Sequence, residues 1–118
     1  PSAVEPSELD RKVNERSRSE LRTPKLGQNY PNPFNPDTWI PYQLIYDSFA
    51  TIKIFDANGN LVRKLDQGYR KAGDYLTRDK AAYWDGKNNL GEEVSSGIYF
   101  YSLETDKFQS VKKMTLKK

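Results

Sequence analysis

The sequence contains neither histidine nor cysteine among its 118 residues. Without histidine, a Ser-His-Asp triad and a histidine-ligated metal site are excluded. Without cysteine, thiol catalysis, zinc ribbons and disulfide bonds are excluded, and this absence fits a secreted protein without disulfides as well as a cytosolic one. No apolar run approaches the ~20 residues that a membrane-spanning helix needs. We therefore predict no metal, no cofactor and no membrane span.

An excess of one charge is also lacking, because 19 basic residues face 16 acidic ones and the two signs are interleaved. A net charge of +3 spread in this way is a weak basis for a nucleic-acid partner, and we predict none. Aromatic residues are abundant, at 13 %. Because aromatic side chains favour strands, the composition indicates a pleated core with large, half-buried side chains.

Residues 1–25 differ from the rest of the chain. They carry eleven charged side chains and no aromatic residue. Ser7 is a suitable N-cap for a helix over 7–22, but its apolar stripe is too thin to hold that helix without a partner. We predict that residues 1–25 are a charged linker or arm, with at most one helix, and that residues 26–118 form the folded domain.

The folded part opens with a turn-rich segment at 27–36 that contains three prolines. Proline excludes a helix there, so we expect an ordered loop anchored by Tyr30 and Phe34. Alternating or continuous apolar patterns then predict strands, with an irregular edge over 75–84 and a polar loop over 85–96. The predicted strands cover 38–45, 49–56, 61–66, 97–104 and 108–117.

Local signals refine this prediction. Pro41 places the first of these strands at an edge or beside a bulge. Asn58-Gly59 predicts a hairpin turn, because it supplies positive φ angles. Residues 97–104 are apolar on both faces, which indicates a central strand covered on both sides. Six or seven strands with turns every 8–12 residues predict an all-β, immunoglobulin-like or fibronectin-III-like β-sandwich.

Three kinds of site are open on the residues alone. Acidic and amide side chains at 85–93 could bind calcium, but Lys87 stands where a ligand should and Leu90 where the loop needs glycine, so a turn is favoured. Exposed aromatic residues could stack on sugars. The candidates for that role are Trp39, Tyr69, Tyr83 and Tyr101. A basic terminal strand could also dock on an acidic groove or add to a partner's sheet.

Four stretches, in order, resemble one family. They are LGQNYPNPFNP at 26–36, IKIFDANGNLVRKL at 52–65, YWDGKNNLGEEVSSGIYFYSL at 83–103 and VKKMTLKK at 111–118. Together they resemble the C-terminal sorting domain (type A) of bacterial type IX secretion cargo, which is related to the immunoglobulin-like domain of the flagellar hook-capping protein. The stretch between Gly73 and Trp84 is longer than is usual in that family.

The resemblance implies a seven-stranded sandwich that catalyses no reaction. It implies a larger cargo protein fused on the N-terminal side, recognition by a protein of the secretion machinery, and a secreted or cell-surface location reached through the periplasm. The implied partner-binding residues lie on the last strand and the strand beside it: Gly97, Ile98, Tyr99, Lys112, Lys113, Met114, Leu116 and Lys117. The alternatives are a carbohydrate- or protein-binding accessory module and a structural assembly domain.

Overall fold

The computed structural model describes residues 24–118, so the helix predicted over 7–22 lies outside the described residues. Residues 24–118 contain strands, turns and loops, and no helix there is long and apolar enough to cross a membrane. The strands are β1 (Lys25–Leu26), β2 (Thr38–Ile40), β3 (Tyr42–Leu44), β4 (Ser48–Phe55), β5 (Leu61–Arg70), β6 (Gly73–Tyr75), β7 (Ala82–Trp84), β8 (Gly97–Glu104) and β9 (Gln109–Leu116).

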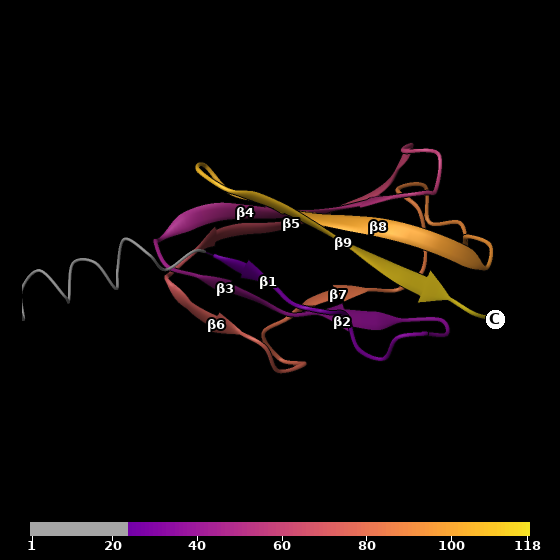
Figure 1. Cartoon of the computed structure of the whole chain (residues 1–118), viewed down its shortest axis with the longest axis horizontal. Helices are drawn as coiled ribbons and strands as arrows, with labels where there is room; N and C mark the ends of the chain where they lie inside the picture. The colour runs from indigo at the N-terminus through magenta and orange to yellow at the C-terminus, as the bar shows by residue number, and fades with distance from the viewer. Residues whose placement is uncertain (1–23) are drawn as a thin grey trace, which may run out of the picture.

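The strands form two facing layers (Figure 1). One layer is a four-stranded antiparallel sheet with the order β5-β4-β8-β9. The other consists of two short sheets, β1-β3-β6 and β2-β7. This arrangement confirms the predicted all-β, immunoglobulin-like sandwich. The predicted count of about seven strands was low, because this second layer is built from strands of only two or three residues.

One of the additional strands arises at Pro41, where a single predicted strand is divided into two. The strand predicted over 38–45 is interrupted there, and β2 pairs with β7 whereas β3 pairs with β1 and β6. Pro41 has no N–H to donate to a ladder, and its carbonyl oxygen accepts a hydrogen bond from the Gly27 N–H at 2.8 Å. The chain therefore changes sheets at this residue while its apolar side chains stay in the core.

The strand predicted over 61–66 was too short, because the chain stays in the strand at Gly68. β5 continues through it to Arg70, and the pairing with β4 slips by one residue beside Gly68. Gly68 has a φ of +75°, and its N–H bonds the Asp66 carboxylate at 2.9 Å. A glycine with positive φ accommodates a β-bulge, so it bends the strand instead of terminating it.

The turn at 56–60 is confirmed. The Asp56 carboxylate accepts the N–H groups of Asn58 and Asn60, each at 2.9 Å, and Gly59 has a φ of +86°. These hydrogen bonds, the one from Asn60 above all, lower the pKa of Asp56. The predicted hairpin of β4 and β5 therefore has a turn held by its first residue.

β8 occupies the predicted central position between β4 and β9. Its inner face is buried at Tyr99, Tyr101 and Leu103. The prediction that both faces are covered was wrong for the first half of the strand, because Ile98 is 44 % exposed and Phe100 is half-buried, whereas Ser102 on the same face is buried. No other layer of residues 24–118 lies over the outer face of the four-stranded sheet.

Trp84 is fully buried near the middle of the core. Its ring lies 5.5 Å from that of Phe34 and 5.6 Å from that of Tyr99, measured between centroids. Its indole N–H donates to the Lys87 carbonyl oxygen at 2.9 Å, so its one polar atom is satisfied. The indole therefore connects both layers and the loop that follows β7.

The segment 27–36 is an ordered loop, as predicted, and we call it the strap. Phe34 anchors it with 1 % exposure, whereas Tyr30 is half-buried. The Phe34 N–H donates to the Thr115 carbonyl oxygen, and the Lys117 N–H donates to the Phe34 carbonyl oxygen, each at 3.0 Å. At Gly86, an added Cβ would lie 2.3 Å from the Pro36 carbonyl oxygen, so only glycine fits beside the strap.

We expect Trp84→Ala to lower the free energy of unfolding by about 3–5 kcal/mol, because it removes the largest fully buried side chain. Urea denaturation followed by circular dichroism measures this loss. Leu90→Ala is the control: Leu90 is 84 % exposed, and we expect a change within about 0.5 kcal/mol. A loss below about 1 kcal/mol for Trp84→Ala would contradict its place in the core.

The buried hydroxyl of Tyr101 leads to a second prediction, which concerns the dependence of stability on pH. Its hydroxyl donates to the Gly27 carbonyl oxygen at 2.8 Å and accepts from the Asn29 N–H at 2.9 Å. Burial raises its pKa from the ordinary 10.0 to about 12. Because the folded state holds this proton to higher pH than the unfolded state, the stabilisation is complete below pH 10 and is lost between pH 10 and 12.

We therefore expect Tyr101→Phe to cost about 1–3 kcal/mol at pH 7, since the Asn29 N–H and the Gly27 carbonyl oxygen lose their partner. The difference from the wild type should shrink as pH rises toward 12. Denaturation of both proteins at a series of pH values measures this difference in the free energy of unfolding. Burial also raises the pKa of Tyr42 to about 12, but Tyr42 is present in both proteins, so its contribution cancels in the difference. A difference independent of pH would show that Tyr101 ionises freely in the folded state.

Candidate partner-binding face

The predicted partner-binding residues all lie on β8, on β9 or just beyond. Gly97 pairs with Leu116, and Tyr99 pairs with Met114. They divide by exposure, however. Tyr99, Met114 and Leu116 are 6 %, 1 % and 1 % exposed, so their side chains belong to the core. The exposed members of the set are Gly97, Ile98, Lys112, Lys113 and Lys117.

The outer face of the four-stranded sheet carries apolar side chains that the prediction did not include. Phe55 pairs with Leu61 on one side and with Phe100 on the other, which places these side chains in one row across three strands. Ile98 on β8 and Val111 on β9 lie on the same face in the two neighbouring rows, opposite Thr115 and Ser102. We call this set the outer patch: Phe55, Leu61, Ile98, Phe100 and Val111.

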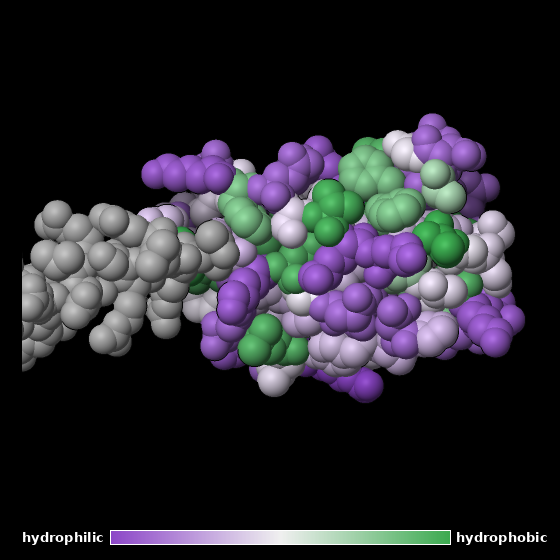
Figure 2. Space-filling view, viewed as in Figure 1, coloured by the Kyte–Doolittle hydropathy of each residue, from purple (hydrophilic) through white to green (hydrophobic). Residues whose placement is uncertain are grey.

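The outer patch is open to solvent. Leu61 is 49 % exposed, Ile98 44 % and Val111 55 %. Figure 2 shows hydrophobic side chains gathered over β8 and β9 on this face, with hydrophilic ones between and around them. Exposed apolar side chains gathered on one face make this face the candidate interaction site. The sequence signal was present in the alternation of 97–104, but periodicity alone could not distinguish a buried second face from an exposed one.

Basic side chains border the outer patch. Lys53 is paired with Glu104 at 2.8 Å. Lys64 stands opposite Lys53, and Lys113 stands opposite Phe100. Within residues 24–118, no carboxylate lies within ion-pair distance of Lys64 or Lys113. The face therefore combines an apolar centre with positive charge that has no partner in the domain.

The free edge of β9 is partly occupied. The strap covers its C-terminal half: Thr115 bonds Asn32 and Phe34, and the Lys113 carbonyl oxygen accepts from the Gln28 side chain at 3.0 Å. Gln109 and Val111 direct their backbone groups to the same side, where residues 24–118 offer them no hydrogen bond. Addition of a partner strand is thus restricted to the first half of β9.

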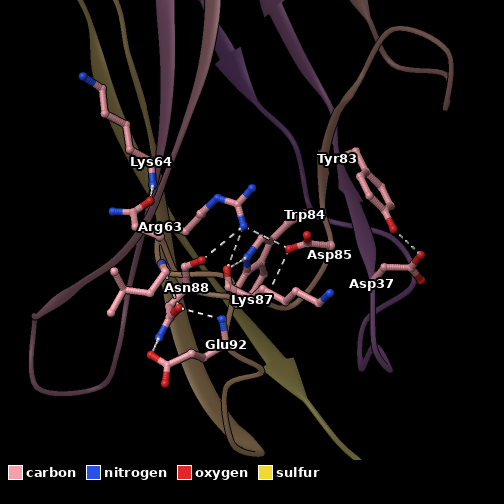
Figure 3. Close-up of polar contacts among 11 residues, drawn as sticks. Asp37, Arg63, Lys64, Tyr83, Trp84, Asp85, Lys87, Asn88 and Glu92 are labelled. Carbon is pink, nitrogen blue, oxygen red and sulfur yellow. Dashed lines mark hydrogen bonds and ion pairs between the residues drawn. The ribbon is translucent and has the colours of Figure 1, made fainter.

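The polar loop at 85–96 is a structural connection (Figure 3). The Asp85 carboxylate accepts from the Arg63 guanidinium at 3.1 Å and from the Lys87 N–H at 3.0 Å. The Asn88 side-chain oxygen accepts the N–H groups of Leu90 and Glu92. The oxygens that a calcium ion would need are therefore engaged in turns and in a link to β5, as the turn interpretation requires.

The four aromatic candidates for sugar binding are separated by the fold. Tyr101 is completely buried, so its assignment as an exposed aromatic was wrong. Tyr69 stacks edge-on against Phe49 at one end of the four-stranded sheet. Trp39 and Tyr83 are cross-strand neighbours on the opposite layer. Only this last pair forms a shared surface among the four.

The fold and the exposed face define a small immunoglobulin-like domain, and residues 24–118 hold no group of three acidic side chains placed to bind a metal ion. The sequence profile of the FlgD Ig-like domain matches residues 47–108, more than half of the chain. The chain belongs to the FlgD Ig-like domain family. This membership agrees with the relationship to the flagellar hook-capping protein that the motifs predict. No curated protein matches the chain.

Solved structures of larger proteins contain the same fold. Dimeric latent PorU from Porphyromonas gingivalis superposes with a TM-score of 0.59 at 18 % identity, over 81 % of this chain and 10 % of its own. PorZ of the same organism, an essential bacterial surface component of the type-IX secretion system, superposes with a TM-score of 0.50 at 19 % identity. The match covers 77 % of this chain and 11 % of PorZ. FlgD from P. aeruginosa superposes with a TM-score of 0.49 at 23 % identity, and the match covers 63 % of this chain and 56 % of FlgD.

These proportions mean that the chain spans about a tenth of PorU and PorZ and just over half of FlgD. At such identities the likeness to PorU and PorZ shows the fold. The comparisons therefore give the family and the fold, and the role of the FlgD-type immunoglobulin-like domain in this protein is a matter for proposal.

The buried members of the predicted set make a testable prediction. A chain that ends at Val111 lacks Met114, Leu116 and the backbone groups that pair with Phe34. Losing buried side chains costs about 2–5 kcal/mol each, which approaches the whole stability of a small domain. We expect this truncated chain to lose its near-ultraviolet circular dichroism and its cooperative unfolding transition.

The control keeps the strand and removes only surface charge, by replacing Lys112, Lys117 and Lys118 with alanine in the full chain. All three side chains are exposed, so we expect its unfolding transition to stay close to that of the wild type. A truncated chain with a sharp transition would contradict the structural role of β9.

Proposed function

We propose that residues 26–118 form a non-catalytic sorting or attachment domain of a larger exported bacterial protein, with residues 1–25 as the linker to its cargo. The observation that carries the proposal is the solvent-exposed outer patch with its unpaired lysines, which spans the four-stranded sheet and includes β8 and β9, the two strands to which the family resemblance assigns recognition. Family membership and the fold shared with PorU and PorZ support it.

Recognition in this proposal acts on the folded sandwich. A protein of the secretion machinery binds the outer patch with an apolar surface bordered by carboxylates, so that Lys64 and Lys113 gain partners while Ile98 and Val111 leave water. Apolar burial provides affinity, and the charges provide rate and specificity. The buried side chains of β9 contribute indirectly, because they hold the strand that presents the patch. The cargo then reaches the cell surface or the medium through the periplasm.

Self-assembly through the same face is less favourable. In a symmetric dimer the same patch is used by both copies, so lysines that have no acidic partner would approach each other. Like charges at an interface oppose association. A structural assembly role therefore fits the charge pattern of this face less well than recognition by an acidic partner does.

The test is an export assay that leaves the fold intact. The full chain follows a signal peptide and a fluorescent reporter in a bacterium with type IX secretion. The patch variant carries Val111→Thr and Lys113→Glu. We expect surface fluorescence to fall roughly tenfold, because loss of apolar contact and reversal of one charge together weaken binding by about 1.4 kcal/mol or more.

The matched control carries Leu76→Thr and Lys80→Glu, the same kinds of change at exposed positions between β6 and β7, on the layer opposite the patch. We expect its export to equal that of the wild type. Equal export of the patch variant, with its fold confirmed by circular dichroism, would refute recognition through the outer patch. A wild-type fusion that stays in the periplasm would refute the sorting function itself.

A further inference from the structure

A row of aromatic rings lies on the outer face of the second layer, far in the fold from the outer patch. Tyr30 bridges to Trp39, and Trp39 pairs with Tyr83 across β2 and β7. The neighbours of Trp39 and Tyr83 along both strands are buried, so these two side chains point outward. We call the three residues the aromatic row.

The rings are close enough to form one surface. The centroids of Tyr30 and Trp39 lie 6.4 Å apart with planes inclined by 21°, and those of Trp39 and Tyr83 lie 5.2 Å apart with planes at 49°. Tyr83 is 46 % exposed, and Tyr30 and Trp39 are half-buried. The loop between β6 and β7 reaches the row through Leu76 and Arg78, and no further strand of residues 24–118 lies over it, so the Tyr83 ring stays the most exposed of the three.

Hydrogen bonds fix the rings in place. The Tyr30 hydroxyl donates to the Leu76 carbonyl oxygen at 2.6 Å. The Tyr83 hydroxyl donates to the Asp37 carboxylate at 2.8 Å, as Figure 3 shows. Each phenol is anchored at its polar tip. A surface held this way is ordered before any ligand arrives, which lowers the entropic cost of binding.

Charged groups of both signs lie beside the aromatic row, namely the Arg78 guanidinium and the Asp37 carboxylate. The Arg78 guanidinium lies 4.2 Å from the centre of the Trp39 ring. Within the described chain no carboxylate lies within ion-pair distance of Arg78, so its N–H edges are available to a ligand. Asp37 uses one carboxylate oxygen for Tyr83, and residues 24–118 place no hydrogen bond on the other. A strong donor and a strong acceptor thus flank a stacked apolar surface.

That combination matches one ligand chemistry. A pyranose ring has an apolar face of C–H groups that stacks on aromatic rings, and a rim of hydroxyls, each able to donate and to accept. A few polar groups beside an apolar surface are what orients such a ligand. The balance of one cation and one anion offers no net attraction to a polyanion. Three rings in a row also provide room for more than one sugar unit.

We propose that the aromatic row, with Arg78 and Asp37, is a binding site for a neutral polysaccharide. The exposed Tyr83 ring stacks on a sugar face, the Arg78 N–H groups beside Trp39 donate to sugar hydroxyls, and Asp37 accepts from them. The site lies on the layer opposite the outer patch, so binding of a glycan leaves recognition by a secretion partner unobstructed.

The experiment is affinity electrophoresis of the full chain in native gels that contain hydroxyethyl cellulose, galactomannan or soluble xylan, with polygalacturonate as a charged polymer. Tryptophan fluorescence titration with the retarding polymer is the second measurement, because Trp39 is accessible and Trp84 is completely buried. We expect at least one neutral polymer to retard the chain and to shift its emission.

Tyr83→Ala and Arg78→Ala should each reduce the retardation at least fivefold. Tyr69→Ala is the matched control, because Tyr69 is 57 % exposed and also contacts a second aromatic ring, but on the other layer. Thermal denaturation verifies the fold of each variant. The proposal is overturned if no neutral polymer retards the wild type, if only polygalacturonate does, or if Tyr83→Ala binds as tightly as Tyr69→Ala. Export is not needed for this test, so its outcome is independent of the sorting function.

Discussion

The backbone pairing between Phe34 and the end of β9 is the interaction on which the rest of this structure depends. Two hydrogen bonds of 3.0 Å join Phe34 to Thr115 and Lys117, while the Phe34 ring packs against Trp84 in the core. One residue of a proline-rich loop thereby secures the last strand and the centre of the sandwich together. The close approach of Pro36 to Gly86 extends this link to the loop after β7. Segments distant in sequence are thus stabilised as one unit.

The strap also determines which surfaces are available for function. Since it occupies the edge of β9 at Lys113 and Thr115, that end of the strand is closed to a partner strand. The buried apolar residues of β9 pack in the core. In the proposed function, the partner therefore binds the broad outer face of the sheet beside them. A terminal strand that belongs to the core links export to folding in this proposal: a chain whose last strand is not in place does not present the face.

The two layers carry different chemistry on their outer faces. The four-stranded sheet presents aliphatic and phenylalanine side chains with lysines, a surface suited to a protein partner. The β2-β7 layer presents tyrosine and tryptophan rings with hydrogen-bonding groups at their edges, a surface suited to hydroxyl-rich rings. The division arises because each layer of a sandwich buries one face and leaves the other to vary. A small domain can in this way hold two separate binding surfaces without a cleft.

The sequence by itself determined the fold class, the hairpin turn at 56–60 and the inner face of β4, because period-two alternation and Asn-Gly turns are local properties. It also excluded histidine and cysteine chemistry outright. Tertiary structure alone decided the change of sheet at Pro41, the bulge at Gly68, the exposure of Ile98 and the stacking of Arg78 on Trp39. Alternation distinguishes the two faces of a strand, but whether the second face is covered depends on neighbours brought from elsewhere in the chain.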